Sequence, residues 1–179
     1  MIKMVQETYV QSINKVLMHK RELEKELNVK IKNKGKLLFV EGAGDDEYLA
    51  LEIIEAIDLG FSVGTALQLK NEEIIFQVFN IRDLTRRSDL KRIRARIIGV
   101  HGKALKTMET LTDCDIAVHE NKIGIIGSSD CIKDGIIAIK SIVQGSTHGN
   151  VYARLEKKKK EKRLAPKEPI KDEFRKKEK

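Results

Sequence analysis

Aromatic side chains are scarce in this chain of 179 residues, where they make up 4% of the sequence, and tryptophan is missing. Nucleic-acid-binding folds that stack bases on aromatic rings are therefore disfavoured, and a fold that holds bases on aliphatic side chains fits better. The 2 cysteines form neither a disulfide framework nor a paired-cysteine metal motif, so we expect no metal and no cofactor. No apolar run approaches the about 20 residues of a membrane span, and we expect a cytoplasmic protein that does not bind membranes.

The net charge of +8 is concentrated in two blocks of the chain. Residues 82–106 carry 9 basic and 2 acidic side chains, and residues 154–179 carry 13 basic and 6 acidic ones. The two other stretches, 1–81 and 107–153, each have a net charge of −3. Such basic blocks point to a phosphate-bearing partner, although a solvated helix face or a solubilising tail would give the same pattern.

A glycine motif, Gly99-x-x-Gly102, lies at the end of the first basic block and is followed by Lys103. A GxxG turn between two helices exposes backbone N–H groups at the start of the second helix, here those of residues 101–104. The helix dipole and these donors favour an anion, and glycine lets a sugar-phosphate backbone approach closely. In RNA-binding KH domains this loop clamps about four nucleotides.

The chain also contains an internal repeat at a spacing of 85 residues, which places Gly42 on Gly127 and Ile54 on Ile139. Each copy alternates strand and helix patterns in a similar order, and Asp45 or Asp46 is expected to cap the last helix of the first copy. The expected strands are 7–13, 29–31, 37–40, 74–81, 115–119 and 123–126, and the expected helices are 15–27, 45–57, 88–98, 103–111 and 129–143.

The order β-α-α-β-β-α, with GxxG between the first two helices, is that of a type I KH domain. We therefore expect an α+β fold of two tandem type I KH domains, followed by a basic helical or disordered tail. No glycine occurs in residues 1–34, so the first domain lacks the clamping turn and either braces its neighbour or binds RNA by another route. The expected division is a degenerate KH domain at 5–60, a connector at 61–72, a KH domain at 73–145, and a loop, helix and basic tail at 146–179.

The expected RNA groove lies between the glycine loop and the strand that contains Ile116. Lys103 and Lys106 add positive charge beside the loop, and two arginines at the end of the preceding helix reach phosphates or base edges. Aliphatic side chains form a floor for the bases, although several of them must belong to the core instead. The expected nucleic-acid-binding residues are Arg94, Arg96, Ile97, Ile98, Gly99, Val100, His101, Gly102, Lys103, Leu105, Lys106, Ile116 and Val118.

Two further stretches complete a resemblance to a known family: Gly145-x-x-His148-Gly149-x-Val151-Tyr152, and the connector around residues 56–67. Together with the GxxG segment, they resemble the archaeal and eukaryotic KH proteins that assist maturation of small-subunit ribosomal RNA. The resemblance implies single-stranded RNA binding near the 3′ end of that RNA and no catalytic activity of the protein's own. It also implies two partners, a Nob-type endonuclease and the rRNA adenine dimethyltransferase. The missing glycines of the first domain depart from the family pattern.

Other functions remain compatible with a KH fold. One is an RNA adaptor of a degradation or translation complex, and another is a scaffold that binds mainly proteins. A nuclease is disfavoured because the sequence contains no carboxylate cluster and no arrangement of a nucleophile beside a base. The motif at residues 145–152 and the missing first GxxG favour the ribosomal assembly factor.

Overall fold

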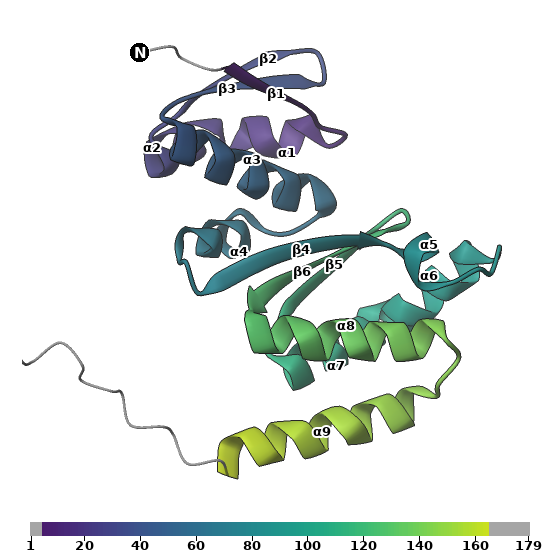
Figure 1. Ribbon diagram of the computed structural model, residues 1–179. Helices are drawn as coiled ribbons and strands as arrows, with labels where there is room; N and C mark the ends of the chain where they lie inside the picture. The colour runs from purple at the N-terminus through teal and green to yellow at the C-terminus, as the bar shows by residue number, and fades with distance from the viewer. Residues whose placement is uncertain (1–4, 165–179) are drawn as a thin grey trace, which may run out of the picture.

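The computed structural model describes residues 5–164, which form two modules stacked on one another (Figure 1). It confirms the α+β class, with one three-stranded antiparallel sheet in each module. The first module contains β1 (Val5–Tyr9), α1 (Ile13–Met18), α2 (Lys20–Leu27), β2 (Lys30–Lys34), β3 (Leu37–Glu41) and α3 (Gly44–Leu59), and a connector follows with α4 (Val63–Leu67) and the short 3-10 helix η1 (Gln68–Lys70). The second contains β4 (Ile74–Asn80), α5 (Ile81–Leu84), α6 (Leu90–Ile98), the 3-10 turn η2 (Val100–Gly102), α7 (Lys103–Thr112), β5 (Asp115–His119), β6 (Lys122–Ser128), α8 (Ser129–Val143) and α9 (His148–Leu164).

The repeat in the sequence corresponds to a repeat in the structure. The strand order is β1-β3-β2 in the first sheet and β4-β6-β5 in the second, so the last strand of each module lies in the centre. β2 and β5 are 85 residues apart at both ends, and so are the first residues of α3 and α8. The spacing continues beyond these helices, because α4 begins at Val63 and α9 begins at His148.

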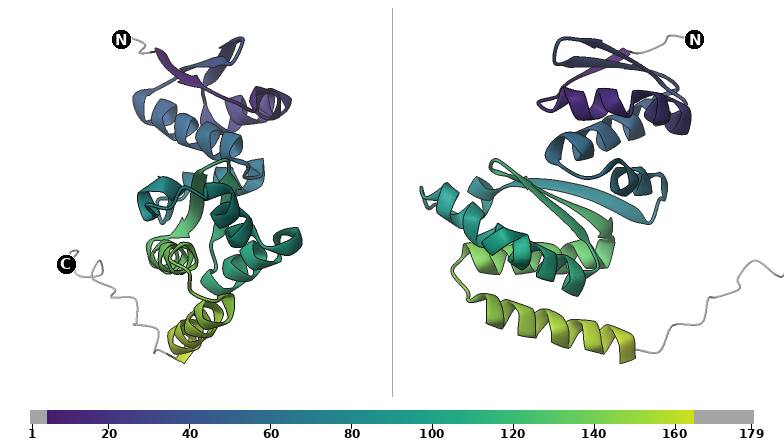
Figure 2. Two further views of the ribbon diagram at one scale, coloured as in Figure 1. Left: turned by 90° about the vertical axis from the view of Figure 1, so that its right-hand side faces the viewer. Right: turned by 180° about the vertical axis from the view of Figure 1, so that it is seen from behind.

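The second sheet is enclosed on both faces. The α3 helix and the connector of the first module cover one face, and α8 covers the other (Figure 2). The central strand β6 therefore has five consecutive buried residues, 123–127, rather than the alternating pattern of a half-exposed strand. Phe61 of the connector meets Phe76 of β4 edge to face, with ring centroids 6.0 Å apart. Ile126 belongs to the core of the first module, so the two modules share apolar packing.

Three expectations about the first module need correction. The first strand ends at Tyr9 rather than at residue 13, because the chain turns at residues 11–12 into α1. The helix expected over 15–27 is broken at His19 into α1 and α2. Neither Asp45 nor Asp46 caps α3: its N-cap is Ala43, and the buried carboxylate of Glu47 accepts a hydrogen bond from the Gly42 amide at 2.8 Å.

Within residues 5–164, no helix has the length and apolar character that crossing a bilayer requires. The tail expected to follow the last helix is described only as far as Leu164, where α9 ends. The last dozen residues, which we expect to be disordered, lie outside the described part of the chain.

We predict that Gly124→Ala separates or destabilises the two modules. A Cβ at this position of β6 would overlap the Leu59 side chain and lie 2.9 Å from the Phe61 ring, in space that is already filled. Overpacking of this kind costs about 1–3 kcal/mol, and thermal unfolding measures it. Gly64→Ala is the matched control, because a Cβ there meets nothing within 4 Å. Equal melting temperatures for the two variants would contradict the proposed packing.

Candidate nucleic-acid interface

The loop between α6 and α7 has an unusual backbone conformation. Gly99, His101 and Gly102 have φ values of +73°, +51° and +74°, in the left-handed region. L-residues other than glycine rarely adopt such values, which explains glycine at two of the three positions. The loop thereby turns the chain within residues 99–102 from the basic helix α6 into helix α7.

The two glycines are required for different reasons. A Cβ on Gly99 would overlap the Ala104 methyl group and lie 2.9 Å from the Ala104 nitrogen, so this glycine allows the loop to pack on the first turn of α7. A Cβ on Gly102 would meet nothing within 4 Å. Within the protein, glycine at 102 is therefore required by the backbone conformation and not by packing, and a substitution there alters the surface without a steric clash.

The start of α7 is open to a ligand. Its N-cap residue is Gly102, which has no side chain to bond the first-turn amides. Val100 is 74% exposed, and His101 and Lys103 are exposed beside it. Of the four amides expected to face phosphate, those of Gly102 and Lys103 donate within the loop, to the Gly99 and Val100 carbonyls. A helix start leaves its first-turn donors without intrahelical acceptors, which creates an anion site.

The positive side chains near this loop fall into two groups. Lys103 and Lys106 are exposed on the first turn of α7. The guanidinium groups of Arg94 and Arg96 are partly used inside the protein. Arg94 donates to the Glu120 carbonyl at 3.2 Å, and Arg96 donates to two carbonyls of the loop that precedes α9. Each guanidinium has five N–H donors, so both retain donors for a ligand.

The expected aliphatic floor is divided between surface and core. Ile97 is fully buried and Ile116 is 4% exposed, and both belong to the core of the second module. They support the groove from below and are not available to a base in this structure. Ile98, Leu105 and Val118 are partly exposed and remain candidates for base contact.

The segment that begins α9 holds both flanks of the loop. The His148 ring donates through Nε2 to the Arg96 carbonyl at 2.9 Å, and the Tyr152 hydroxyl lies 3.5 Å from the Ala104 carbonyl. In return, Arg96 donates to the carbonyls of Gly145 and Ser146 at 3.2 and 2.5 Å. His148 thus helps to orient the loop. Sequence reasoning missed Tyr152, although the motif at residues 145–152 contained it.

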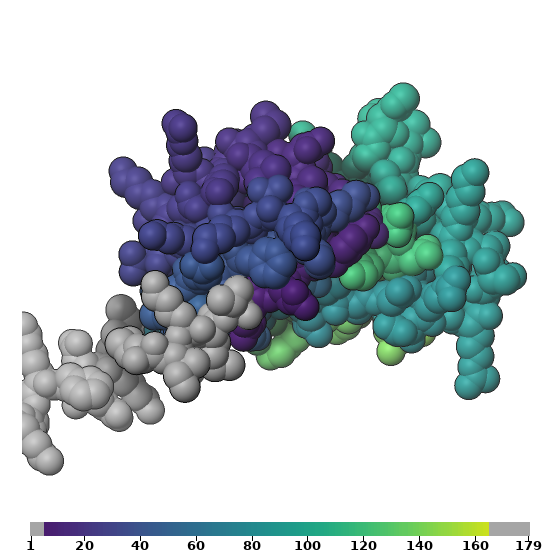
Figure 3. Space-filling model, turned by 90° about the horizontal axis from the view of Figure 1, so that it is seen from above, coloured from purple at the N-terminus to yellow at the C-terminus, as the bar shows by residue number. Residues whose placement is uncertain are grey.

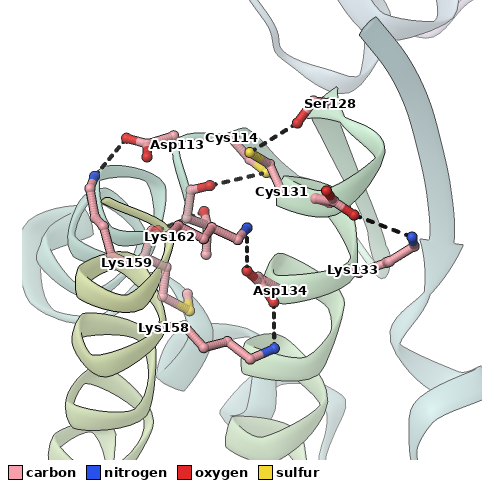
Figure 4. A network of polar contacts seen from close by, with 12 residues as sticks. Asp113, Cys114, Ser128, Cys131, Lys133, Asp134, Lys158, Lys159 and Lys162 are labelled. Carbon is pink, nitrogen blue, oxygen red and sulfur yellow. Dashed lines mark hydrogen bonds and ion pairs between the residues drawn. The ribbon is translucent and has the colours of Figure 1, made fainter. Parts of the chain in front are cut away.

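The rest of α9 is fixed by ion pairs around Asp134 of α8 (Figure 4). This carboxylate is nearly buried, and it accepts hydrogen bonds from Lys158 at 2.6 Å and Lys162 at 2.8 Å. Burial raises the pKa of Asp134, but the hydrogen bonds and positive charges of the two lysines together outweigh burial, so its pKa lies below the usual value. The adjacent residue of α9, Lys159, pairs with Asp113 at 2.6 Å. Three lysines of the second basic block therefore hold the helix in place.

The first module has no counterpart of this loop. Residues 14–17, which the 85-residue spacing aligns with the glycine motif, lie inside helix α1. Only His19 separates α1 from α2, and its φ of −107° is ordinary for an L-residue. The amide of His19 donates back to the Val16 carbonyl at 3.2 Å. The positive-φ glycine turn of the second module is therefore absent between α1 and α2.

The second module matches a family model. Residues 75–160 match the model for the second KH domain of PNO1, described as a eukaryotic-type, type I KH domain. The match extends through β4 and most of α9, so α9 is part of the family's unit.

Curated relatives include pre-rRNA-processing proteins. A KH domain-containing protein of Methanocaldococcus jannaschii is 28% identical over 77% of this chain and 64% of its own length. RNA-binding protein pno1 of Dictyostelium discoideum is 31% identical over 59% and 46%. A Schizosaccharomyces pombe relative, 32% identical over 59% and 45%, is named pre-rRNA-processing protein pno1. The chain thus spans less than two thirds of these relatives.

Solved structures resemble nearly the whole chain. Dim2p from Pyrococcus horikoshii is 26% identical, with a TM-score of 0.77 over 87% of this chain and 99% of that one. The complex of a/eIF2alpha, aDim2p and rRNA from the same organism contains a chain that is 28% identical, with a TM-score of 0.79 over 89% and 96%. A protein of unknown function from Aeropyrum pernix is 28% identical, with a TM-score of 0.78 over 91% and 94%.

The loop, the order of elements and the family match together make the second module a type I KH domain. This KH domain is of the PNO1 type, and the chain is a homologue of the pre-rRNA-processing proteins named PNO1 and Dim2. The expected family resemblance is confirmed.

We predict that Asp134→Asn loosens α9 in a pH-dependent manner. A carboxylate whose pKa is lowered in the folded state stabilises that state above its unfolded pKa, about 4, and loses this effect as pH falls further. Because both lysines are partly exposed, the loss at pH 7 should be about 1–2 kcal/mol. The measurement is the difference in melting temperature between wild type and variant, which should shrink between pH 7 and pH 3. If the difference in melting temperature is the same at pH 7 and pH 3, the charge of Asp134 is not the cause of the destabilisation.

Proposed function

We propose that this protein is a non-catalytic assembly factor of the small ribosomal subunit whose second module binds single-stranded RNA at the loop of residues 99–102. The observation that carries the proposal is the start of α7, which is exposed, has no capping side chain and lies at the end of a segment of net charge +7. A phosphate backbone satisfies the open donors and the positive charge together.

Each side of the groove has its own role in this proposal. Gly99 and Gly102 let the RNA backbone approach, and Val100 and His101 form the exposed tip of the loop. Lys103 and Lys106 attract phosphates, and Arg94 on α6 reaches the RNA strand. Ile98, Leu105 and Val118 contact bases, while the buried Ile97 and Ile116 keep the groove in shape.

Two comparisons support ribosomal RNA as the target. One structural neighbour was solved with rRNA and a/eIF2alpha, and several relatives are named pre-rRNA-processing proteins. By the family resemblance, the bound segment lies near the 3′ end of the small-subunit RNA. A Nob-type endonuclease and the rRNA adenine dimethyltransferase then act on the RNA that this protein presents or protects.

The first module, residues 5–60, is in this proposal a degenerate KH domain that braces the second. Its α3 helix and the connector at 61–72 cover the sheet that supports the RNA groove of residues 73–145. The segment from residue 146 onward holds the loop through α9 and adds positive charge. A brace needs no clamp, which agrees with the lack of a positive-φ glycine turn between α1 and α2.

A second candidate function is an RNA adaptor in a translation complex. It is suggested by the structural neighbour that was solved in a complex with both rRNA and a/eIF2alpha. Crosslinking in cells followed by sequencing of the bound RNA separates the two candidates. Enrichment of precursor small-subunit RNA supports the assembly factor, whereas enrichment of mature subunits or messenger RNA supports the adaptor.

We predict that Gly102→Asp abolishes binding of single-stranded RNA and preserves the fold. The carboxylate would occupy the anion site, and no neighbouring atom lies within 4 Å of the new Cβ. Gly102→Asn is the matched control, since asparagine has the same size, tolerates positive φ and carries no charge. Fluorescence anisotropy with labelled RNA should show at least a tenfold greater loss for the aspartate variant. Equal affinities for both variants and the wild type would remove this loop from the interface.

We also predict a strong dependence of RNA affinity on salt. Neutralising four phosphates releases counterions from single-stranded RNA at about 0.7 per contact, so log affinity should fall against log salt with a slope of about −3. Titrations between low and physiological salt measure this slope. A flat profile would show that the basic segment does not contact the backbone.

A further inference from the structure

Helix α6 carries arginines on two opposite sides. Successive residues of an α-helix are rotated by about 100°, so Arg92 and Arg96 share one side and Arg94 points the other way. The contacts agree, because Arg94 reaches the Glu120 carbonyl at the turn between β5 and β6, next to the groove. Arg92 and Arg96 instead face the end of α8 and the loop that follows it.

A hollow of about 230 Å³ lies on this second side. Its rim contains Arg87, Arg92, Arg96 and a single acidic residue, Asp89. Its floor is apolar and well packed: Ile93 is 4% exposed, and Ile142 and Val143 are each 1% exposed. Viewed from above, the teal part of the chain that includes α6 extends beyond the first module, so the first module does not cover this part of the chain (Figure 3).

The hollow is electrically unbalanced. The structure records no ion pair between the guanidinium groups of Arg87 or Arg92 and any of the residues 5–164. Arg96 is fixed in place by the carbonyls of Gly145 and Ser146. One preorganised and two uncommitted guanidinium groups around a rigid floor are suited to a phosphate, which such groups bind through paired hydrogen bonds.

We propose that this hollow binds a phosphate group of the RNA strand held by the glycine loop, outside the four-nucleotide groove. The inference rests on the proposed RNA binding of the second module and adds a second contact to it. RNA is favoured over an acidic protein because the hollow and the glycine loop both adjoin helix α6, so one RNA strand can contact both. Arg92 precedes Gly99 by seven residues, about 10 Å along the helix axis, so a strand that leaves the loop reaches the hollow within a few nucleotides.

The test compares two RNA lengths with the full-length protein. The variant Arg87→Gln/Arg92→Gln removes two charges from the hollow and leaves the groove side of α6 unchanged. The control Lys133→Gln/Lys157→Gln removes two charges from exposed positions of α8 and α9. Anisotropy titrations use single-stranded RNAs of four and twelve nucleotides.

For the arginine variant we expect affinity within twofold of wild type for the four-nucleotide RNA and about tenfold weaker for the twelve-nucleotide RNA. The salt slope for the longer RNA should become shallower by about 0.7, from the one lost phosphate contact. The lysine control should change both lengths by a similar small factor. An unchanged affinity for the longer RNA, or an equal loss for both lengths, overturns the second site. If wild-type protein binds neither RNA, the proposed function fails and this inference fails with it.

Discussion

The bend between α6 and α7 depends on a backbone conformation that most residues avoid. Three of its four residues have positive φ, and glycine relieves the strain at two of them. The bend brings the end of an arginine-rich helix to the uncapped start of another helix. Positive charge and open amide donors therefore meet at one exposed point. Without this conformation, the same residues would form a longer basic helix with no site for a phosphate.

Much of the remaining structure holds this bend in place. The second sheet supports α6 and α7 through buried isoleucines, and the first module encloses its opposite face. The most specific support comes from α9, because His148 and Tyr152 contact main-chain carbonyls on both flanks of the loop. Asp134 then anchors the far part of α9 through two lysines. The basic C-terminal block thus has a structural role as well as an electrostatic one.

Local patterns in the sequence predict much of the second module. The alternating run Asp115–His119 is a strand with the expected ends, and Gly99-x-x-Gly102 lies between two helices as its spacing indicates. Long-range features are harder to predict, because helical spacing gives the apolar residues of a helix without saying which face is covered. Ile97 and Ile98 are adjacent and equally apolar, yet only Ile97 is fully buried. The bond from His148 to Arg96 joins residues 52 positions apart, and no local pattern contains it.

The most direct test of the account is a titration of ¹⁵N-labelled protein with short single-stranded RNA, followed by the amide signals in NMR spectra. The NMR signals of amide groups that bind phosphate shift strongly, because hydrogen bonding changes the shielding of these groups. The account predicts that the largest shifts occur at residues 99–105, with smaller shifts along β5 and little change in α2 of the first module. Shifts confined to the first module, with residues 99–105 unaffected at saturation, would contradict it.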